Sequence, residues 1–174
     1  ATVYSGLDNL PKGILYWRAI LNWIGGIGII VMAIAILPAL KIGGMRLFKT
    51  ESSDTSEKIL PRSSSMSAAI GGVYLVLSLV TAIAYYLAGM NGFDAITHMM
   101  ATVATGGFAN YDASFGVYKE MPQIYWLSSF FMLLAAMPFV LFISMVKGDR
   151  KALWKDPQVR AFLLIVAFCT ALLT

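Results

Sequence analysis

One apolar segment of this chain is too short to cross a lipid bilayer, although it lies between two segments that are long enough. It runs from Phe93 to Val103, about half of the ~20 apolar residues that a membrane-spanning helix needs. Asn91 and Gly92 supply a turn before it, and the glycine pair at 106–107 ends it. We therefore predict a half-helix at 92–103, which enters the membrane from one side and returns to the same side.

The other apolar residues form blocks long enough to span a membrane. Hydrophobic residues make up 59% of the 174 residues and charged residues only 13%, whereas soluble domains are about 45–50% apolar and ~25% charged. We therefore expect an all-α integral membrane protein. Pro138 predicts a kink in one span, since proline removes a backbone hydrogen bond. The predicted spans are about 14–40, 66–90, 122–146 and 157–174.

The order of these segments predicts a repeating unit of span, half-helix, loop and span. Tyr and Trp open the first span at 16–17 and stand near the start of the third at 125–126, although such pairs also serve as interfacial anchors. The chain begins without Met and stops in an apolar run, so we expect an internal piece of a longer protein. The first repeat contributes its flank and second span at 1–40, and a loop at 41–65 follows. A complete repeat occupies 66–146, with its glycine loop at 104–108. A second loop at 147–156 leads to the start of a third repeat at 157–174.

The basic residues predict the orientation. Most of the 13 Lys and Arg residues lie in the loops at 41–65 and 147–156 or just after them, and only Lys12, Arg18 and Lys119 belong to the opposite side. The positive-inside rule then makes both loops cytoplasmic and opens the glycine loop to the outer face. The basic loop at 147–156 also offers a contact for anionic lipid or a regulatory subunit. A basic face with aromatic readers is missing, so we expect no nucleic acid partner.

The residues after the half-helix, 104–108, are here called the candidate filter loop. Non-helical backbone at membrane depth is tolerated only where protein buries it or where it lines a watery path. We predict an extended backbone from Ala104 to Gly107, in which the glycines at 106 and 107 permit positive φ and so let successive carbonyls point the same way. The carbonyl end of the half-helix, about 101–103, favours a cation. Backbone carbonyls can replace an ion's water shell, but several such loops are needed to surround an ion.

The motifs resemble those of one known family. Thr-Val-Ala-Thr-Gly-Gly-Phe at 102–108, Gly-Leu-Asp-Asn-Leu-Pro at 6–11 and Trp-Ile-Gly-Gly-Ile-Gly at 23–28 resemble the Trk-type potassium uptake proteins of bacteria. That family belongs to a superfamily with the Ktr and plant HKT transporters, in which four span–pore–span repeats surround one pore. The resemblance covers the whole chain. It implies that this chain holds one complete repeat of a four-repeat potassium-channel-like pore.

The resemblance also implies roles for particular residues. The backbone carbonyls of Ala104, Thr105, Gly106 and Gly107 would line the ion path. Those of Ala104 and Thr105 would bind potassium, with Gly106 as the selectivity glycine. In the family, Gly at this position goes with potassium preference and Ser with sodium leakage. The Thr-Thr-Gly of the first filter would precede Ala1, and the third and fourth filters and the gating loop would follow residue 174.

Partners and location follow from the same resemblance. The full-length protein would be a multi-pass protein of the bacterial cytoplasmic (inner) membrane and would form a homodimer in the lipid bilayer. It would bind a cytoplasmic ring of nucleotide-binding regulatory subunits. Potassium would be its ion, with no organic cofactor. Whether transport is channel-like or ion-coupled symport stays open.

Two polar residues of the half-helix, Asp94 and His98, lie four apart on one face. They could be metal ligands or a proton relay, but no further ligand stands at a suitable spacing. We prefer hydrogen bonds that anchor the half-helix, and we expect Thr102 and Val103 to support the pore in the same way.

Arg18 and the glycines of the first span each have two possible roles. Arg18 could face the pore or pair with a carboxylate, and we prefer snorkelling to the interface. Gly25, Gly26 and Gly28 could form a gating hinge, and we prefer close helix packing.

The sequence is compared with three classes of function. The first is a potassium-translocating subunit that is not an enzyme. The second is a polytopic membrane enzyme, which needs paired Asp, Ser with His, or a metal cluster at membrane depth; the predicted spans offer none. The third is a membrane scaffold without transport, which would leave the Thr-Gly-Gly loop unexplained.

Overall fold

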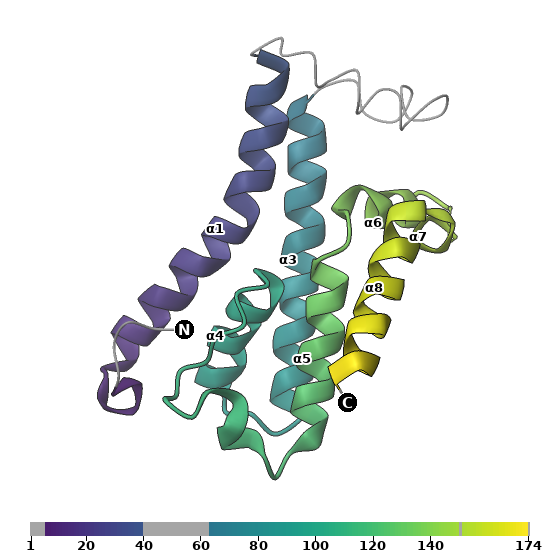
Figure 1. The fold of residues 1–174 in the computed structure, drawn as a ribbon. Coiled ribbons are helices and arrows are strands. Elements are labelled where there is room, and N and C mark those ends of the chain that lie inside the picture. The colour runs from purple at the N-terminus through teal and green to yellow at the C-terminus, as the bar shows by residue number, and fades with distance from the viewer. Residues whose placement is uncertain (1–5, 40–62, 150, 174) are drawn as a thin grey trace. The chain divides into compact units, whose positions relative to one another are not determined.

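The computed structural model describes residues 6–39, 63–149 and 151–173 (Figure 1). The expected flank at 1–3 and nearly all of the loop expected at 41–65 lie outside these residues. The described chain is helical, with no strand in these ranges. Its elements are η1 (Leu7–Asn9), α1 (Lys12–Ala39), α3 (Ser63–Leu87), α4 (Gly92–Val103), η3 (Ser114–Tyr118), α5 (Pro122–Ala135), α6 (Phe139–Val146), α7 (Ala152–Lys155) and α8 (Pro157–Leu173).

The chain forms two compact units, of which residues 1–136 are the first. Within it the short helix α4 packs against α1, α3 and α5 (Figure 1). The C-terminal end of α4 comes close to α1 at Gly26, where a Cβ atom would lie 2.8 Å from the Cβ of Ala104 and 3.0 Å from the hydroxyl of Tyr74. Tyr74 is near the middle of α3. The half-helix therefore ends about halfway along its long neighbour.

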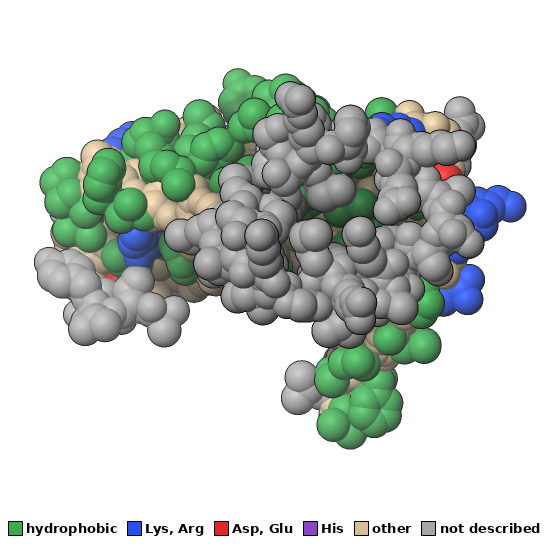
Figure 2. All heavy atoms as spheres, turned by 90° about the horizontal axis from the view of Figure 1, so that it is seen from above, with side chains coloured by type: hydrophobic (Ala, Val, Ile, Leu, Met, Phe, Trp, Pro, Cys, Tyr) green, Lys and Arg blue, Asp and Glu red, His purple; other side chains and the backbone are tan. Residues whose placement is uncertain are grey.

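The first unit exposes many large apolar side chains in addition to burying an apolar core. Ile70 and Ile124 are at most 1% exposed, whereas Leu79 of α3 is 62% exposed. The polar side chains of Thr81, Thr97, His98 and Thr102 are also buried, each at most 2% exposed. In Figure 2, hydrophobic side chains cover much of the surface that is not drawn in grey. Exposed apolar side chains in this number suit a surface in contact with lipid or with further transmembrane helices.

Two segments of the described chain have the length and apolarity of a membrane span. The stretch Ala68–Leu87 of α3 has a mean hydropathy of 2.0 over 20 residues. The second is the pair α5 and α6, if the two are counted as one broken span.

The span expected at 122–146 is interrupted rather than kinked. Pro122 begins α5 at the first helical position, where its missing N–H costs nothing. The helix ends at Ala135, and α6 begins after Pro138, whose backbone is extended at φ −60° and ψ 119°. Proline cannot donate the hydrogen bond that would continue the helix, and it disfavours helical backbone before it. The disturbance expected at Pro138 is present, but it is a break between two helices and not a kink within one.

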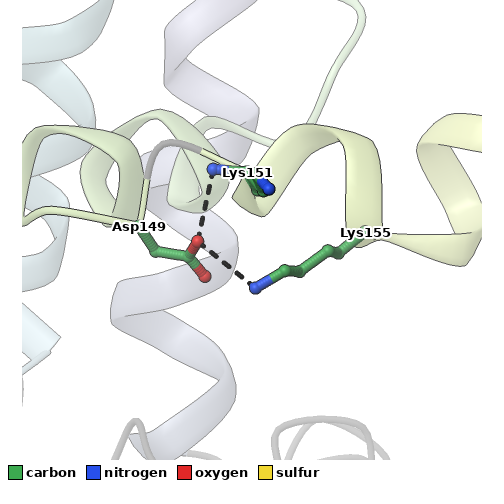
Figure 3. Close-up of polar contacts among 3 residues, drawn as sticks. All are labelled: Asp149, Lys151 and Lys155. Atoms are coloured by element: carbon green, nitrogen blue, oxygen red, sulfur yellow. Dashed lines mark hydrogen bonds and ion pairs between the residues drawn. The ribbon is translucent and has the colours of Figure 1, made fainter.

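Residues 137–174 form the second unit. Asp156 caps α8 by accepting from the backbone N–H of Gln158 and of Val159 at 2.9 and 3.1 Å. Asp149 accepts from the N–H of Lys151 at 3.2 Å and lies 3.6 Å from the ammonium of Lys155 (Figure 3). This ion pair is exposed, so it contributes little to stability and leaves the segment basic.

Candidate functional site

The half-helix α4 begins at a side-chain cap. Asn91 has extended backbone, and its Oδ1 accepts from the N–H of Asp94 at 2.9 Å. The amide of Asn91 also donates to Oδ2 of Asp94 at 2.6 Å. Asparagine is a preferred N-cap, and an acidic residue in the first turn interacts favourably with the helix dipole. The start of α4 is thus determined by residues 91–94.

A Schellman motif ends α4, with threonine where glycine is usual. The N–H of Gly106 donates to the carbonyl of Ala101 at 2.7 Å, and that of Thr105 donates to the carbonyl of Thr102 at 3.0 Å. Thr105 has φ 53°, in the left-handed region. This conformation satisfies carbonyls that would otherwise be unpaired, but it is rare for a β-branched residue.

The candidate filter loop was expected to be extended from Ala104 onward. Its first residues are not extended. Ala104 has φ −79° and ψ 2°, and positive φ occurs at Thr105 and Gly107 but not at Gly106. The hydroxyl of Thr105 donates to the carbonyl of Ala104 at 2.8 Å. The extended backbone was a wrong prediction because the end of α4 turns through the Schellman motif first.

The loop still presents unpaired acceptors. The carbonyls of Thr105, Gly106 and Gly107 accept no hydrogen bond from any residue in the described ranges. All three residues are exposed in this chain. Exposed carbonyls in series can bind water or a cation. They are three of the four carbonyls expected to line the ion path, and the fourth, that of Ala104, accepts from the hydroxyl of Thr105.

Three residues of α1, spaced four apart, face this loop. Arg18 donates to the carbonyl of Ala109, and its guanidinium lies 4.9 Å from the ring centre of Phe108. Asn22 lies against Gly106, and Gly26 lies against Ala104. Spacing of i, i+4 and i+8 puts residues on one helix face. We call Arg18, Asn22 and Gly26 the loop-facing stripe.

The stripe and the loop run in opposite directions. The eight residues from Arg18 to Gly26 rise about 12 Å along α1, while the loop passes from Ala109 back to Ala104. Arg18 pairs with no carboxylate in the described ranges, and its half-buried guanidinium supplies a donor to a loop carbonyl. Gly26 packs closely, as preferred, whereas no described atom lies within 4 Å of a Cβ at Gly25 or Gly28 outside their own helix.

Asp94 is the centre of a buried hydrogen-bond network. Its Oδ1 accepts from the amide of Asn110 at 2.9 Å, and its Oδ2 accepts from the hydroxyl of Tyr111 at 2.5 Å. The same amide donates to the hydroxyl of Thr97 at 2.6 Å. Asn110 and Tyr111 follow the candidate filter loop, so the network joins the start of the half-helix to the end of the loop.

His98 lies beside this network and contacts the backbone carbonyl of Asp94, not its carboxylate. Its Nδ1 lies 2.8 Å from the carbonyl of Asp94, and its ring packs edge-on against Phe115 and Tyr118. Within the described ranges no group of three or more His, Cys, Asp or Glu could hold a metal. Because amide and hydroxyl donors occupy both carboxylate oxygens, the geometry favours an anchor over a metal site or proton relay.

The end of the half-helix is held by α3. The hydroxyls of Thr102 and Tyr85 are 2.6 Å apart, and both side chains are buried. Val103, the next residue in the chain, is also buried, with 2% of its surface exposed. Thr102 and Val103 thus lie behind the loop rather than on its exposed side, which suits the supporting role expected of them.

Burial and nearby charge raise the pKa of two tyrosines that follow the loop. Burial, together with the hydrogen bond to Asp94, raises the pKa of Tyr111 to about 12. Burial and the negative charge of Asp94 raise the pKa of Tyr118. Both phenols are neutral at physiological pH, so Tyr111 remains a donor to the carboxylate.

Sequence reasoning missed several of these residues. The residues that were not singled out are Asn22, Tyr85, Asn110, Tyr111 and Asp112. The carboxylate of Asp112 accepts from the backbone N–H groups of Gly6 and Leu7 at 3.0–3.1 Å. The polar run at 110–112 after an apolar segment was the available signal.

This fold defines the chain as part of an all-α membrane protein in which a half-helix and its loop lie between two long helices. The chain belongs to the TrkH family of cation transport proteins, whose family model matches residues 1–174.

Named relatives agree with this assignment. The chain is 51% identical over 174 residues to the Trk system potassium uptake protein TrkI of Halomonas elongata, covering 100% of this chain and 35% of that protein. It is 40% identical over 180 residues to the Trk system potassium uptake protein TrkH of Escherichia coli K12, covering 99% and 37% of the two chains. The chain thus spans about 35% of the length of TrkI.

A solved structure is similar as well. The crystal structure of the potassium transporter TrkH from Vibrio parahaemolyticus superposes with a TM-score of 0.79 at 42% sequence identity. The match covers 97% of this chain and 33% of that chain.

Proposed function

We propose that this chain contributes one quarter of the potassium-selective pore of a bacterial potassium uptake protein. Its part is the candidate filter loop, in which the carbonyls of residues 104–107 bind the dehydrated ion. The observation that carries the proposal is the set of unpaired, exposed carbonyls at Thr105, Gly106 and Gly107, at the end of a helix that stops halfway along α3.

The chemistry of this loop favours a cation. The C-terminal end of α4 carries the partial negative charge of the helix dipole, although two of its carbonyls are used by the Schellman motif. An ion at Ala104 competes with the hydroxyl of Thr105, which releases the carbonyl by rotating about χ1. One loop cannot surround an ion, so three further loops of the full-length protein complete the site.

The orientation and partners are part of the same proposal. The loop opens to the outer face, because the segment at 147–155 and the sequence at 41–62 are rich in Lys and Arg and are therefore cytoplasmic. The full-length protein resides in the inner membrane as a homodimer and binds a cytoplasmic nucleotide-binding regulatory subunit. The basic segment at 147–155 is a contact of suitable charge for such a subunit or for anionic lipid.

The test uses the full-length protein in proteoliposomes. Gly106→Ser is expected to weaken discrimination of potassium against sodium, since selectivity depends on the number and placement of coordinating carbonyls. Gly92→Ala is the matched control, because no described atom lies within 4 Å of a Cβ at Gly92 beyond its own helix and neighbours. Potassium and sodium fluxes that Gly106→Ser leaves unchanged would contradict the filter assignment.

A further inference from the structure

The backbone of Gly106 does not explain why this position is glycine. Its φ lies outside the left-handed region that favours glycine, which in this loop is occupied by Thr105 and Gly107. A residue with a side chain could therefore adopt the backbone conformation of Gly106. The reason for glycine has to lie in the surroundings of the residue.

Those surroundings are the side chain of Asn22. A Cβ atom on Gly106 would lie 2.4 Å from Nδ2 of Asn22 and 3.0 Å from both its Cγ and its Oδ1. The contact thus involves the whole amide group and not only its outermost atom. Real Cβ atoms do not approach other atoms to 2.4 Å, so either the amide or the loop must move.

Contacts on both sides of Asn22 restrict movement of the loop away from α1. One turn before Asn22, Arg18 is attached to the carbonyl of Ala109, and one turn after it, Gly26 is in contact with Ala104. The helix and the loop therefore touch on both sides of the Asn22 contact. The Nδ2 atom of Asn22 is itself buried, with no hydrogen-bond partner within the described ranges.

We propose that Asn22 is a positioning residue for the candidate filter: its amide fills the space that a side chain at position 106 would need. It thereby restricts position 106 to glycine and sets the path of the loop backbone beside it. The proposal rests on the proposed function and deepens it. The filter of this repeat is then shaped by a helix of the preceding repeat, and selectivity depends on a residue that binds no ion through its own backbone.

A double-mutant cycle in the full-length protein tests this inference. Gly106→Ala is expected to lower both potassium uptake and the potassium-to-sodium flux ratio by about tenfold, the size of a coupling between groups in contact. Asn22→Ala in the same chain frees the space and is expected to restore both quantities to within about threefold of the wild type. Asn22→Leu keeps a side chain of similar size and is expected not to restore them.

Controls separate the possible outcomes. Leu21→Ala is the matched control for Asn22→Ala, since the adjacent Leu21 side chain is 54% exposed on α1. Where Gly106→Ala lowers the amount of folded protein instead of its flux, Asn22→Ala is expected to restore that amount for the same steric reason. A double variant as impaired as Gly106→Ala alone, or a Gly106→Ala variant like the wild type, overturns the role of Asn22. Failure of the proposed function appears elsewhere, as a wild-type protein that does not select potassium over sodium.

Discussion

The hydroxyl of Tyr111 donates to the carboxylate of Asp94 with 2.5 Å between the oxygen atoms, and this contact joins the two ends of the re-entrant segment. Asp94 lies in the first turn of α4, and Tyr111 follows the candidate filter loop. The loop is thus closed at its base by a partly buried, charged hydrogen bond. Two anchored ends restrict the spacing of the carbonyls between them.

Removal of this hydroxyl should destabilise the protein. Tyr111→Phe deletes a hydrogen bond to a charged group and is expected to lower the free energy of unfolding by about 1.5–3 kcal/mol. Tyr125→Phe is the matched control, because its exposed hydroxyl donates only to the carbonyl of Phe115 and its loss should change stability by less than about 0.5 kcal/mol. Thermal unfolding of the purified full-length protein measures both variants. Equal decreases in unfolding temperature would show that the hydrogen bond to the carboxylate stabilises the protein no more than the exposed one does.

The same hydroxyl predicts a dependence of stability on alkaline pH. The pKa of Tyr111 is about 12 in the folded protein and 10.0 as the ordinary value, so folding favours the neutral phenol. Its stabilising contribution is complete below pH 10 and is lost as pH rises from 10 through about 12. Thermal stability measured across this range should fall more steeply in the wild type than in Tyr111→Phe. Parallel curves would contradict the assignment.

Arg18 should be needed for the shape of the loop. Arg18→Leu removes the donor to Ala109 and the cation over Phe108, and it is expected to reduce potassium uptake about tenfold, the effect of losing a charge-assisted contact of about 1.4 kcal/mol. Arg18→Lys should reduce potassium uptake nearly as much as Arg18→Leu, because an ammonium lacks the planar fork of the guanidinium. Rubidium uptake in proteoliposomes measures the effect.

Lys119→Leu is the matched control for Arg18→Leu. It also removes a positive charge from the side predicted to be external, at an exposed position after η3. Uptake reduced equally by both variants would assign the effect to the surface charge that attracts cations and not to the geometry of the loop.

Two adjacent glycines of α1 should respond differently to alanine. Gly26→Ala brings a methyl group within 2.8 Å of the Cβ of Ala104, so it should separate α1 from the loop and lower stability by about 1–3 kcal/mol. Gly25→Ala meets no described atom within 4 Å and should be neutral or stabilise the helix by up to about 1 kcal/mol. Thermal unfolding and potassium uptake of the two variants check this, and similar losses in both would favour a hinge over close packing.

Some features of the site follow from local sequence. The length of the apolar run at 93–103 marks a helix too short to span, and Asn91 caps it through atoms three residues away. Pro138 in the interior of a predicted span indicates a disturbed helix, because proline lacks the N–H that the helix interior requires. The TrkH family membership follows from motifs along the chain. These signals act between residues that are neighbours in sequence, so they can be seen without a structure.

The conformation of the loop was not predictable in this way. The two glycines indicated where positive φ is permitted, but the Schellman motif places Thr105 in the left-handed region and leaves Gly106 outside it. Threonine accepts this strained conformation because two backbone hydrogen bonds and the packing of α4 determine the path of the chain. A propensity for one residue cannot reveal a constraint imposed by its neighbours in space.

The sequence by itself determined that this chain is a membrane protein with a half-helix ending in a glycine loop. Only the tertiary structure decided which residues hold that loop in place. Arg18 reaches Ala109 across 91 positions of sequence, and Asn110 reaches Asp94 across 16. Such contacts depend on how α1, α4 and the returning loop pack together, and no period or motif within one segment encodes the identity of its partner.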